Sequence, residues 1–460
     1  MSNKPSPGSL PAKFLHGSIM RHIWVMTTTS AIGLVGIFLV ELIDMLFLSM
    51  LDNDDIIAGV GFAASISFFT VSLSIGITIS MAALVSRMVG KRNIEQARRY
   101  VVNVSVLAFC LTSLLATLIW FNLASLLSLL GASGGALDVG VSYLQILVPS
   151  MPILATGMAM SAALRAVGDA HLSMVTTLAG GIVNALLDPI FIFALGLEAE
   201  GAAIATAIGR FVILFMAFWG VTSKHKLMKR FVMADFREDL KPIFKIAGPA
   251  MLTNMSTPIG NAIVIKTVAI YGTAYVAGFA IVSRISPVAF ALVFSLSGAI
   301  TPIIGQNFGA YNFDRIYQTV KKSLYFNAAY VTLVSLALLL LQQPIIALFK
   351  LQGEAAELIH LFCTWLAITF MFNGAQFIAN STFNNLGKPM YATWFNVGRS
   401  TLGTLPFVII GGQLAQAGGV MIGQAIGGII FSVAAVWVAF RHIKQLRNKY
   451  KSVGKTLPNQ

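Results

Sequence analysis

Three acidic residues lie inside apolar stretches of the chain, where a charged side chain is costly. Glu41 and Asp44 occur in ELIDMLFLS, and Asp188 occurs in NALLDPIFIF, directly before a proline. An ionised carboxylate at the centre of a bilayer costs roughly 2.5 to 3.5 kcal/mol even on the lenient insertion scale. A membrane protein that keeps such residues is therefore expected to use them, and a carboxyl group suits the binding and release of a proton or a small cation.

The spacing of these acids predicts a cluster. Glu41 and Asp44 are three residues apart, and Asn184 and Asp188 are four apart, so each pair shares one face of a helix. A carboxyl group buried beside other carboxyl groups holds a proton more readily than one in water, so it can exchange a proton near neutral pH. With Asn184 and Thr206 supplying neutral oxygens, the same cluster could instead hold a small cation.

Each acid also has a plainer explanation. Asp188 could cap backbone groups that Pro189 leaves without a helical hydrogen bond. Asp44 has no neighbouring proline or glycine that needs such help, which favours a functional role. Glu41 could be a relay for an ion or simply a residue that lines a cavity.

Basic residues also occur inside the apolar stretches, and each could have a structural or a functional role. Lys266 lies near the end of its predicted helix, from which its ammonium group can reach the membrane surface. Arg210, Arg284 and Arg399 lie deeper. They could bind backbone carbonyls, pair with an acid, or line a cleft and bind an anionic ligand.

The composition predicts a helical membrane protein that crosses the bilayer many times. Of 460 residues, 57% are hydrophobic and 10% are charged, and the mean hydropathy is +0.81. Twelve membrane spans are predicted, at residues 23–50, 57–86, 101–130, 140–166, 172–195, 201–221, 243–270, 274–306, 320–349, 356–384, 390–411 and 416–440.

The net charge of +14 falls almost wholly on alternate loops and the C-terminal tail. This pattern predicts that both termini are cytoplasmic and explains the charge without nucleic acid. No signal-peptide cleavage is expected. Cys110 and Cys363 lie far apart inside predicted spans, so we expect free thiols and neither a disulfide nor a metal site.

The chain repeats itself with an offset of about 219 residues. Gly59, Ile66 and Asn93 match Gly278, Ile285 and Asn312. A duplicated unit of six helices gives two lobes of the same orientation, related by an axis along the membrane normal. The predicted organisation is a cytoplasmic tail 1–22, an N-lobe 23–222, a basic linker 223–242, a C-lobe 243–441 and a cytoplasmic tail 442–460. The acids break this repeat, because Leu405 stands opposite Asp188 and the second lobe has no acid deep within its predicted spans; Glu357 lies at the very start of the span 356–384.

Four motifs carry a resemblance to a known family. LRAVGDA at 164–170, NALLDPIFIF at 184–193 and EGAAIATAIG at 200–209, together with ELIDMLFLS in the first span, resemble the multidrug and toxic compound extrusion (MATE) transporters over essentially all twelve spans. The resemblance is greatest to the DinF-like branch, which relies on acids of the first lobe. The matching positions are Asp44, Asn184, Asp188 and Thr206.

The resemblance implies a V-shaped pair of six-helix bundles around a central cleft. It also implies alternating access, with export of diverse, often cationic amphipathic drugs or dyes against influx of H⁺ or Na⁺. Val40 and Met158 stand where some relatives have polar residues, which weakens the case for a Na⁺ shell. We therefore expect proton coupling, no cofactor, no enzymatic activity, and a monomer in a bacterial inner membrane.

Two transport alternatives stay open. A Na⁺-coupled drug antiporter would use the same cluster as cation ligands. A flippase of the wider MOP superfamily would carry an anionic lipid-linked substrate, if the three arginines meet in the cleft. An intramembrane enzyme is not supported, because the chain has neither an HExxH nor a GxSxG motif, and a passive channel fits the buried acids poorly.

Overall fold

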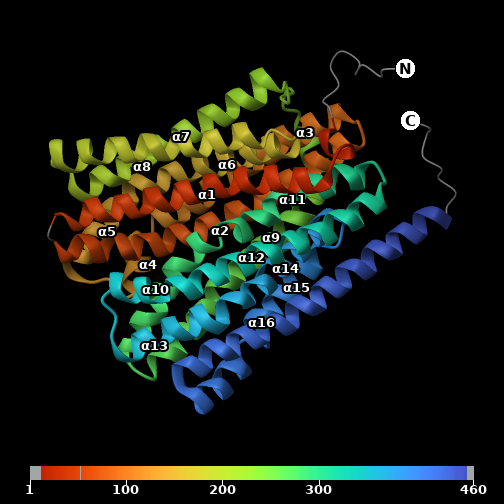
Figure 1. Ribbon diagram of the computed structural model, residues 1–460. Helices are drawn as coiled ribbons and strands as arrows, with labels where there is room; N and C mark the ends of the chain where they lie inside the picture. The colour runs from red at the N-terminus through yellow and green to blue at the C-terminus, as the bar shows by residue number, and fades with distance from the viewer. Residues whose placement is uncertain (1–11, 52, 453–460) are drawn as a thin grey trace. The chain divides into compact units, whose positions relative to one another are not determined.

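The computed structural model describes residues 12–51 and 53–452, and these form helices and short connections with no strands among them (Figure 1). The predicted all-α class is therefore confirmed. The predicted tails 1–22 and 442–460 extend beyond the described residues. Both described cysteines are free thiols.

Contacts divide the chain into two units. The first contains Ile32–Met251 and the second contains Phe14–Ala31 and the residues from Leu252 onward, while Lys13 belongs to the first. The division falls inside α1 (Ile19–Ser49) and α9 (Met233–Ala269), and not in the linker 223–242. These helices have 31 and 37 residues, or about 46 and 55 Å at 1.5 Å per residue, so each is long enough to belong to both units. The two breaks are separated by almost the same offset as the sequence repeat.

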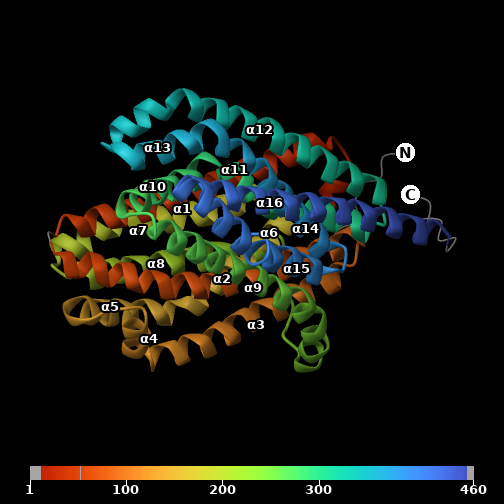
Figure 2. The same ribbon diagram turned by 90° about the horizontal axis from the view of Figure 1, so that it is seen from below.

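The first unit is built from seven further helices. They are α2 (Asp54–Gly90), α3 (Ile94–Trp120), α4 (Leu123–Leu129), α5 (Gly134–Leu147), α6 (Met151–Ala166), α7 (Ala170–Pro189) and α8 (Glu198–Trp219). Three short helical turns belong to this unit as well: η2 (Val148–Ser150) before α6, η3 (Ile190–Ala194) after α7 and η4 (Gly220–Lys224) after α8. A further turn, η1 (Lys13–Leu15), precedes α1. Helix α8 packs against α5, α6 and α7, and α4 forms the bend between α3 and α5 (Figure 2).

Glycines bring α7 and α8 together. A Cβ atom on Gly180 would lie 2.8 Å from the carbonyl oxygen of Gly209, and one on Gly209 would lie 2.7 Å from that of Gly180. Close backbone approach through small residues is how helices associate in membranes. This contact lies one turn from Asn184 on α7 and one turn from Thr206 on α8, so it fixes the two helix faces that carry the predicted cluster.

The second unit repeats this plan. Its helices are α10 (Thr273–Ala289), α11 (Ala291–Gly309), α12 (Phe313–Leu348), α13 (Gly353–Leu361), η5 (Phe362–Leu366), η6 (Ala367–Thr369), α14 (Phe370–Asn385), α15 (Pro389–Ser400) and α16 (Leu405–Ser452). Helix α16 reverses direction at Ala415 and Gln416, which have non-helical backbone angles. Glycines line the contact between its two arms, since Gly423 packs on the carbonyl of Phe407, and Gly427 packs on the carbonyl of Gly403 in the turn before α16.

The structure agrees with the twelve predicted membrane spans when the reversal in α16 and the helix α9 are taken into account. Ten stretches of the described chain are long and apolar enough to cross a membrane. One of them, Pro389–Ser452, contains the reversal in α16 and so accounts for two predicted spans. Helix α9 is missing from the ten but covers the predicted span 243–270, and its lysines and small polar residues lower its hydropathy.

Candidate functional site

The predicted acids Asp44 and Asp188 are joined by one amide in the first unit. Asp44 lies on α1, and Asn184 and Asp188 lie one turn apart on α7. The Asn184 Nδ2 atom donates hydrogen bonds to Asp44 Oδ1 at 2.9 Å and to Asp188 Oδ2 at 3.1 Å. Both amide hydrogens of Asn184 are thus used by carboxyl groups, and these bonds link α1 to α7.

The cluster is rich in acceptors and largely buried. Asn184 is 4% exposed, Asp188 is 0% exposed, and Asp44 is half-buried. Asn184 Oδ1 and Asp188 Oδ1 have no hydrogen-bond partner in the described chain, and no described base forms an ion pair with Asp44 or Asp188. The two carboxyl groups also lie close together, because both accept from the same amide nitrogen. Two neighbouring carboxyl groups repel one another when both are ionised, so this arrangement is suited to holding one positive charge.

Helix α7 ends at this cluster in a way that leaves Asp188 free for it. Pro189 is the last residue of α7, and the chain continues in the π-helical turn η3, where Leu195 N donates to Ile190 O at 2.9 Å. Asp188 accepts no backbone hydrogen bond from the described residues. The wider turn therefore accommodates the proline without a cap from the carboxyl group.

A tyrosine that the sequence did not single out completes the surroundings. Tyr143 on α5 lies near Thr206 on α8 and interacts electrostatically with Asp44, Asp188 and Arg210. Thr206 makes no hydrogen bond to either acid among those described. The available sequence signal was a lone phenol in the apolar segment VSYLQIL, which by itself does not distinguish packing from function.

Glu41 lies beside the cluster without joining its hydrogen bonds. It is exposed on α1 and interacts electrostatically with Asp44, three residues away. This position leaves both predicted roles for Glu41 open.

The three predicted cleft-lining arginines have different surroundings. Arg210 is buried and donates to Ser150 Oγ at 2.9 Å and to the carbonyl of Leu147 at 3.3 Å. Arg399 is half-buried and donates to Asn373 Oδ1. Arg284 alone of the three is exposed. The structure therefore does not bring the three together within one unit, because Arg210 belongs to the first unit and the others to the second.

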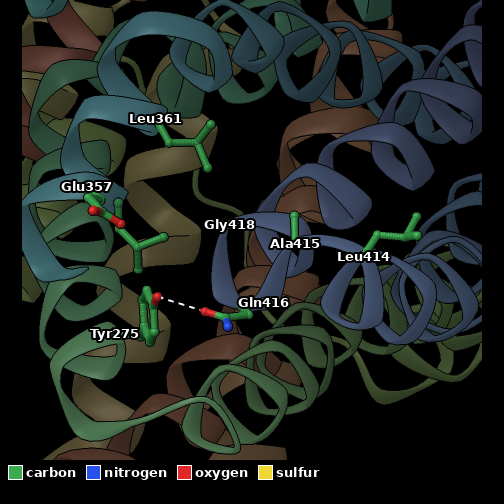
Figure 3. Close-up of a pocket in the computed structure, with 8 residues that line it drawn as sticks. Tyr275, Glu357, Leu361, Leu414, Ala415, Gln416 and Gly418 are labelled. Carbon is green, nitrogen blue, oxygen red and sulfur yellow. Dashed lines mark hydrogen bonds between the residues drawn. The ribbon is translucent and has the colours of Figure 1, made fainter.

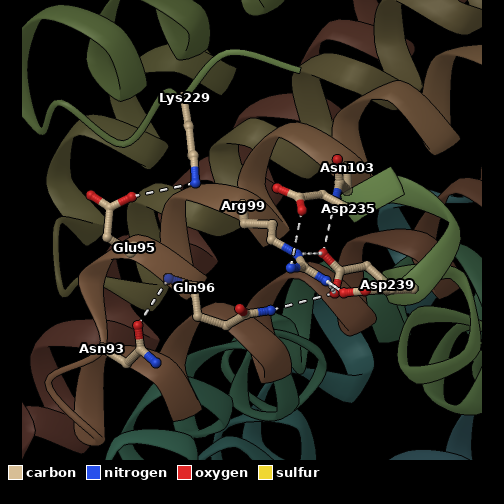
Figure 4. A network of polar contacts seen from close by, with 9 residues as sticks. Asn93, Glu95, Gln96, Arg99, Asn103, Lys229, Asp235 and Asp239 are labelled. Atoms are coloured by element: carbon tan, nitrogen blue, oxygen red, sulfur yellow. Dashed lines mark hydrogen bonds and ion pairs between the residues drawn. The ribbon is translucent and has the colours of Figure 1, made fainter. Parts of the chain in front are cut away.

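An acidic and amide-rich network ties the beginning of α9 to α3 in the first unit (Figure 4). Asp239, which is 2% exposed, accepts from Arg99 Nε at 2.8 Å and from Arg99 Nη2 at 2.9 Å. Asn103 Nδ2 donates to the same carboxylate at 2.7 Å. Glu238 and Asp235 bind the outer edge of the Arg99 guanidinium at 2.7 and 3.3 Å. The start of α9 is thus held on the first unit by a hydrogen-bonded ion pair whose carboxylate is buried.

A second clamp involves the aspartate of the LRAVGDA motif. Asp169 caps α7 by accepting from Leu172 N at 3.1 Å, and it pairs with Lys224 and His225 at 2.8 Å each. Burial by itself would raise the pKa of the Asp169 carboxyl, but the hydrogen bonds from Lys224, His225 and Leu172 outweigh burial and lower the pKa to about 2. The motif aspartate is therefore a structural anion that joins α7 to the end of η4.

The second unit has a cavity of about 420 Å³ at the turn of α16 (Figure 3). Its lining includes Tyr275, Glu357, Leu361 and Gln416, and Tyr275 Oη donates to Gln416 Oε1 at 3.0 Å. Gln416 has a φ of 50°, which is unfavourable for a residue with a side chain. None of the predicted ion-coupling residues lines this cavity.

Comparison with known proteins gives the family. The sequence profile of the MatE family matches residues 30–190 and 249–410, one stretch in each half of the chain. The protein belongs to the MatE family. It is therefore a membrane transporter and not an enzyme, and the resemblance found in the sequence motifs is confirmed.

Relatives of this MatE protein carry different named cargoes. An FAD transporter of Shewanella oneidensis is 28% identical over 434 residues, covering 93% of this chain and 96% of the relative. The multidrug export protein MepA of Staphylococcus haemolyticus is 24% identical over 448 residues, covering 95% and 96%. In structure, the bent form of the Vibrio cholerae MATE transporter VcmN matches with a TM-score of 0.88 at 26% identity, covering 94% of this chain and 98% of VcmN.

Proposed function

We propose that this protein exports small amphipathic molecules by antiport with protons, and that Asp44, Asn184 and Asp188 carry the coupling proton. The observation that carries the proposal is the single amide that bridges two carboxyl groups in a largely buried cluster, with two further acceptors lacking donors. A bound proton would satisfy this surplus of acceptors.

The position of Asp44 suggests how a proton could act on the rest of the protein. Protonation removes the charge that Asn184 solvates, so it weakens a link between α1 and α7. The part of α1 before Ile32 belongs to the second unit. A change at Asp44 therefore acts on a helix that both units share, and it can bias an equilibrium between two conformations.

We favour H⁺ over Na⁺ as the coupling ion. A Na⁺ ion needs several oxygen ligands, yet Thr206 forms no hydrogen bond with Asp44, Asn184 or Asp188 in the described chain. Val40 packs beside Gly181, where a polar side chain could have contributed an oxygen. The contact of both carboxyl groups with one amide nitrogen also fits a shared proton better than a metal ion between them.

The experiment that tests this function uses purified protein in liposomes loaded with a cationic dye. We expect dye movement under an imposed pH gradient and none under an imposed Na⁺ gradient. Asp44→Asn should abolish the movement while retaining the folded state, as judged by its elution profile and melting temperature. Movement driven by Na⁺ alone would assign the cluster to Na⁺, and full activity of the variant would refute coupling through Asp44.

A second candidate cargo is a flavin dinucleotide, favoured by the FAD transporter among the relatives. The same liposomes loaded with FAD would test it. Gradient-driven FAD efflux would support this candidate. Efflux of neither FAD nor dye would favour the anionic lipid-linked substrate considered above, which a headgroup-accessibility assay detects.

We further propose a monomer in a bacterial inner membrane with both termini cytoplasmic. The bacterial origin of the relatives and the positive charge on alternate loops support this placement. Labelling of single cysteines introduced near the two ends of the chain, in intact cells and in inverted vesicles, tests the orientation.

A further inference from the structure

Arg284 is a charged residue within a predicted membrane-spanning segment. It lies in α10, eleven residues after Thr273, or about 16 Å along the helix at 1.5 Å per residue. Arg284 therefore lies well inside the predicted span 274–306, which is longer than the ~30 Å thickness of the hydrocarbon core. The side chain is exposed, and it makes no hydrogen bond or ion pair with residues 12–51 or 53–452.

Arg284 faces away from the hydrophobic core of the second unit, to which Phe279 and Val282 belong. On the same side of α10, Ala277, Ala280, Ser283 and Val288 are exposed too. The three of these that precede Arg284 are small and leave room beside the guanidinium group. An arginine facing hydrocarbon is costly, and charged residues within membrane-spanning segments almost always face a water-filled cavity or a partner.

The fold itself does not require an arginine here. The repeat offset of 219 that joins Ile66 to Ile285 places Ser65 opposite Arg284, and Ser65 is also exposed. The same scaffold position thus carries a small neutral residue in one half and a guanidinium group in the other. When an exposed residue differs between the two halves of the chain, binding of a transported molecule explains the difference better than packing within the fold.

We propose that Arg284 determines specificity by binding the anionic group of a transported molecule, so that the cargo includes amphipathic organic anions. This inference rests on the proposed export function. A guanidinium group offers donors in a planar fork that matches a carboxylate, sulfonate or phosphate. The Ser283 hydroxyl on the same exposed side supplies a further donor, and the apolar part of the molecule has room over Ala277 and Ala280.

The test compares an anionic and a cationic probe in the same proteoliposomes. Lucifer yellow serves as the anion and ethidium as the cation, each driven by an imposed pH gradient. Arg284→Gln should lower Lucifer yellow transport at least tenfold through a higher KM, and should leave ethidium transport within twofold. Arg284→Lys should lie between, because it keeps the charge and loses the fork. Lys266→Gln is the matched control, because Lys266 is an exposed basic residue of the same unit. It should change the transport of neither probe.

The outcomes separate this inference from the function on which it rests. Wild-type transport of ethidium without Lucifer yellow would overturn the role of Arg284 and leave the export function standing. Equal loss of both probes in Arg284→Gln would show a structural role instead. Transport of neither probe by the wild type would refute the export function and this inference with it. Ala280→Phe gives a second test that keeps the charge, since filling the space beside Arg284 should lower Lucifer yellow transport selectively.

Discussion

The ion pair between Arg99 and Asp239 offers a quantitative test of how the start of α9 is held. Arg99→Gln removes both hydrogen bonds from the guanidinium group to a carboxylate whose side chain is 3% exposed. Asn103 remains as a donor to that carboxylate at 2.7 Å. Breaking a buried pair from one side leaves an uncompensated charge and costs about 3 to 5 kcal/mol.

We expect the lower end of that range, about 3 kcal/mol, because Asn103 stays and the Arg99 side chain is 18% exposed. Asp239→Asn should cost less, about 1 to 2 kcal/mol, since Asp235 and Glu238 still neutralise Arg99. The double variant should be no less stable than Arg99→Gln, because it leaves no buried charge.

Thermal unfolding of the detergent-purified protein measures these differences. For a unit of roughly 200 residues, 3 kcal/mol corresponds to a decrease in Tm of about 6 to 12 °C. Glu95→Gln is the matched control, because Glu95 pairs with Arg98 on the same helix and its side chain is 66% exposed. It should change stability by less than about 0.5 kcal/mol. A decrease for Arg99→Gln no larger than that of the control would refute the reasoning.

Three further predictions address other parts of the structure. Gly427→Ala should destabilise the fold by about 1 to 3 kcal/mol through overpacking, because its Cβ would meet the carbonyl of Gly403, and Tm or the folded yield should fall. The control Gly298→Ala has open space around its Cβ and should be tolerated. Equal behaviour of the two variants would contradict the close packing of α16. Because the pKa of Asp169 is lowered in the folded state, its ionised carboxyl group stabilises the fold above about pH 4, and this contribution is lost as pH falls toward 2. Asp169→Asn should therefore lower Tm at pH 7 but much less at pH 2.5. A decrease in Tm that does not depend on pH would contradict the ionic clamp. Tyr143→Phe should lower pH-driven transport about tenfold, equivalent to about 1.4 kcal/mol, with Tm nearly unchanged; unaltered transport would remove Tyr143 from the site.

Much of the fold could be predicted because a bilayer strongly restricts structure. Apolar segments of sufficient length must be helices, and the offset of 219 residues revealed the duplication. The division of α1 and α9 between two units could not be predicted, because it depends on where each long helix finds its packing partners. The reversal of α16 at Ala415 and Gln416 was expected only as a gap between two spans, since its tight turn has glycines nearby but none at the turn itself.

The candidate site could be predicted as far as its acids. The helical spacing of Asn184 and Asp188 indicated one face, and the structure adds that the same amide reaches Asp44 on α1. Tyr143 was missed because its role depends on the packing of α5 against α8, which sequence spacing does not report. For the same reason the sequence could not separate the buried Arg210 from the exposed Arg284.

The most direct test of the central claim measures protons released when a cargo molecule binds. In weakly buffered solution, adding a transported dye to the detergent-purified, protonated protein should acidify the medium by up to one proton per protein molecule, because linkage makes cargo and proton weaken each other's binding. Asp44→Asn should bind the dye without releasing protons. Dye binding with no proton release by the wild type, or with the same release by Asp44→Asn, would contradict the proposal that this cluster couples protons to transport.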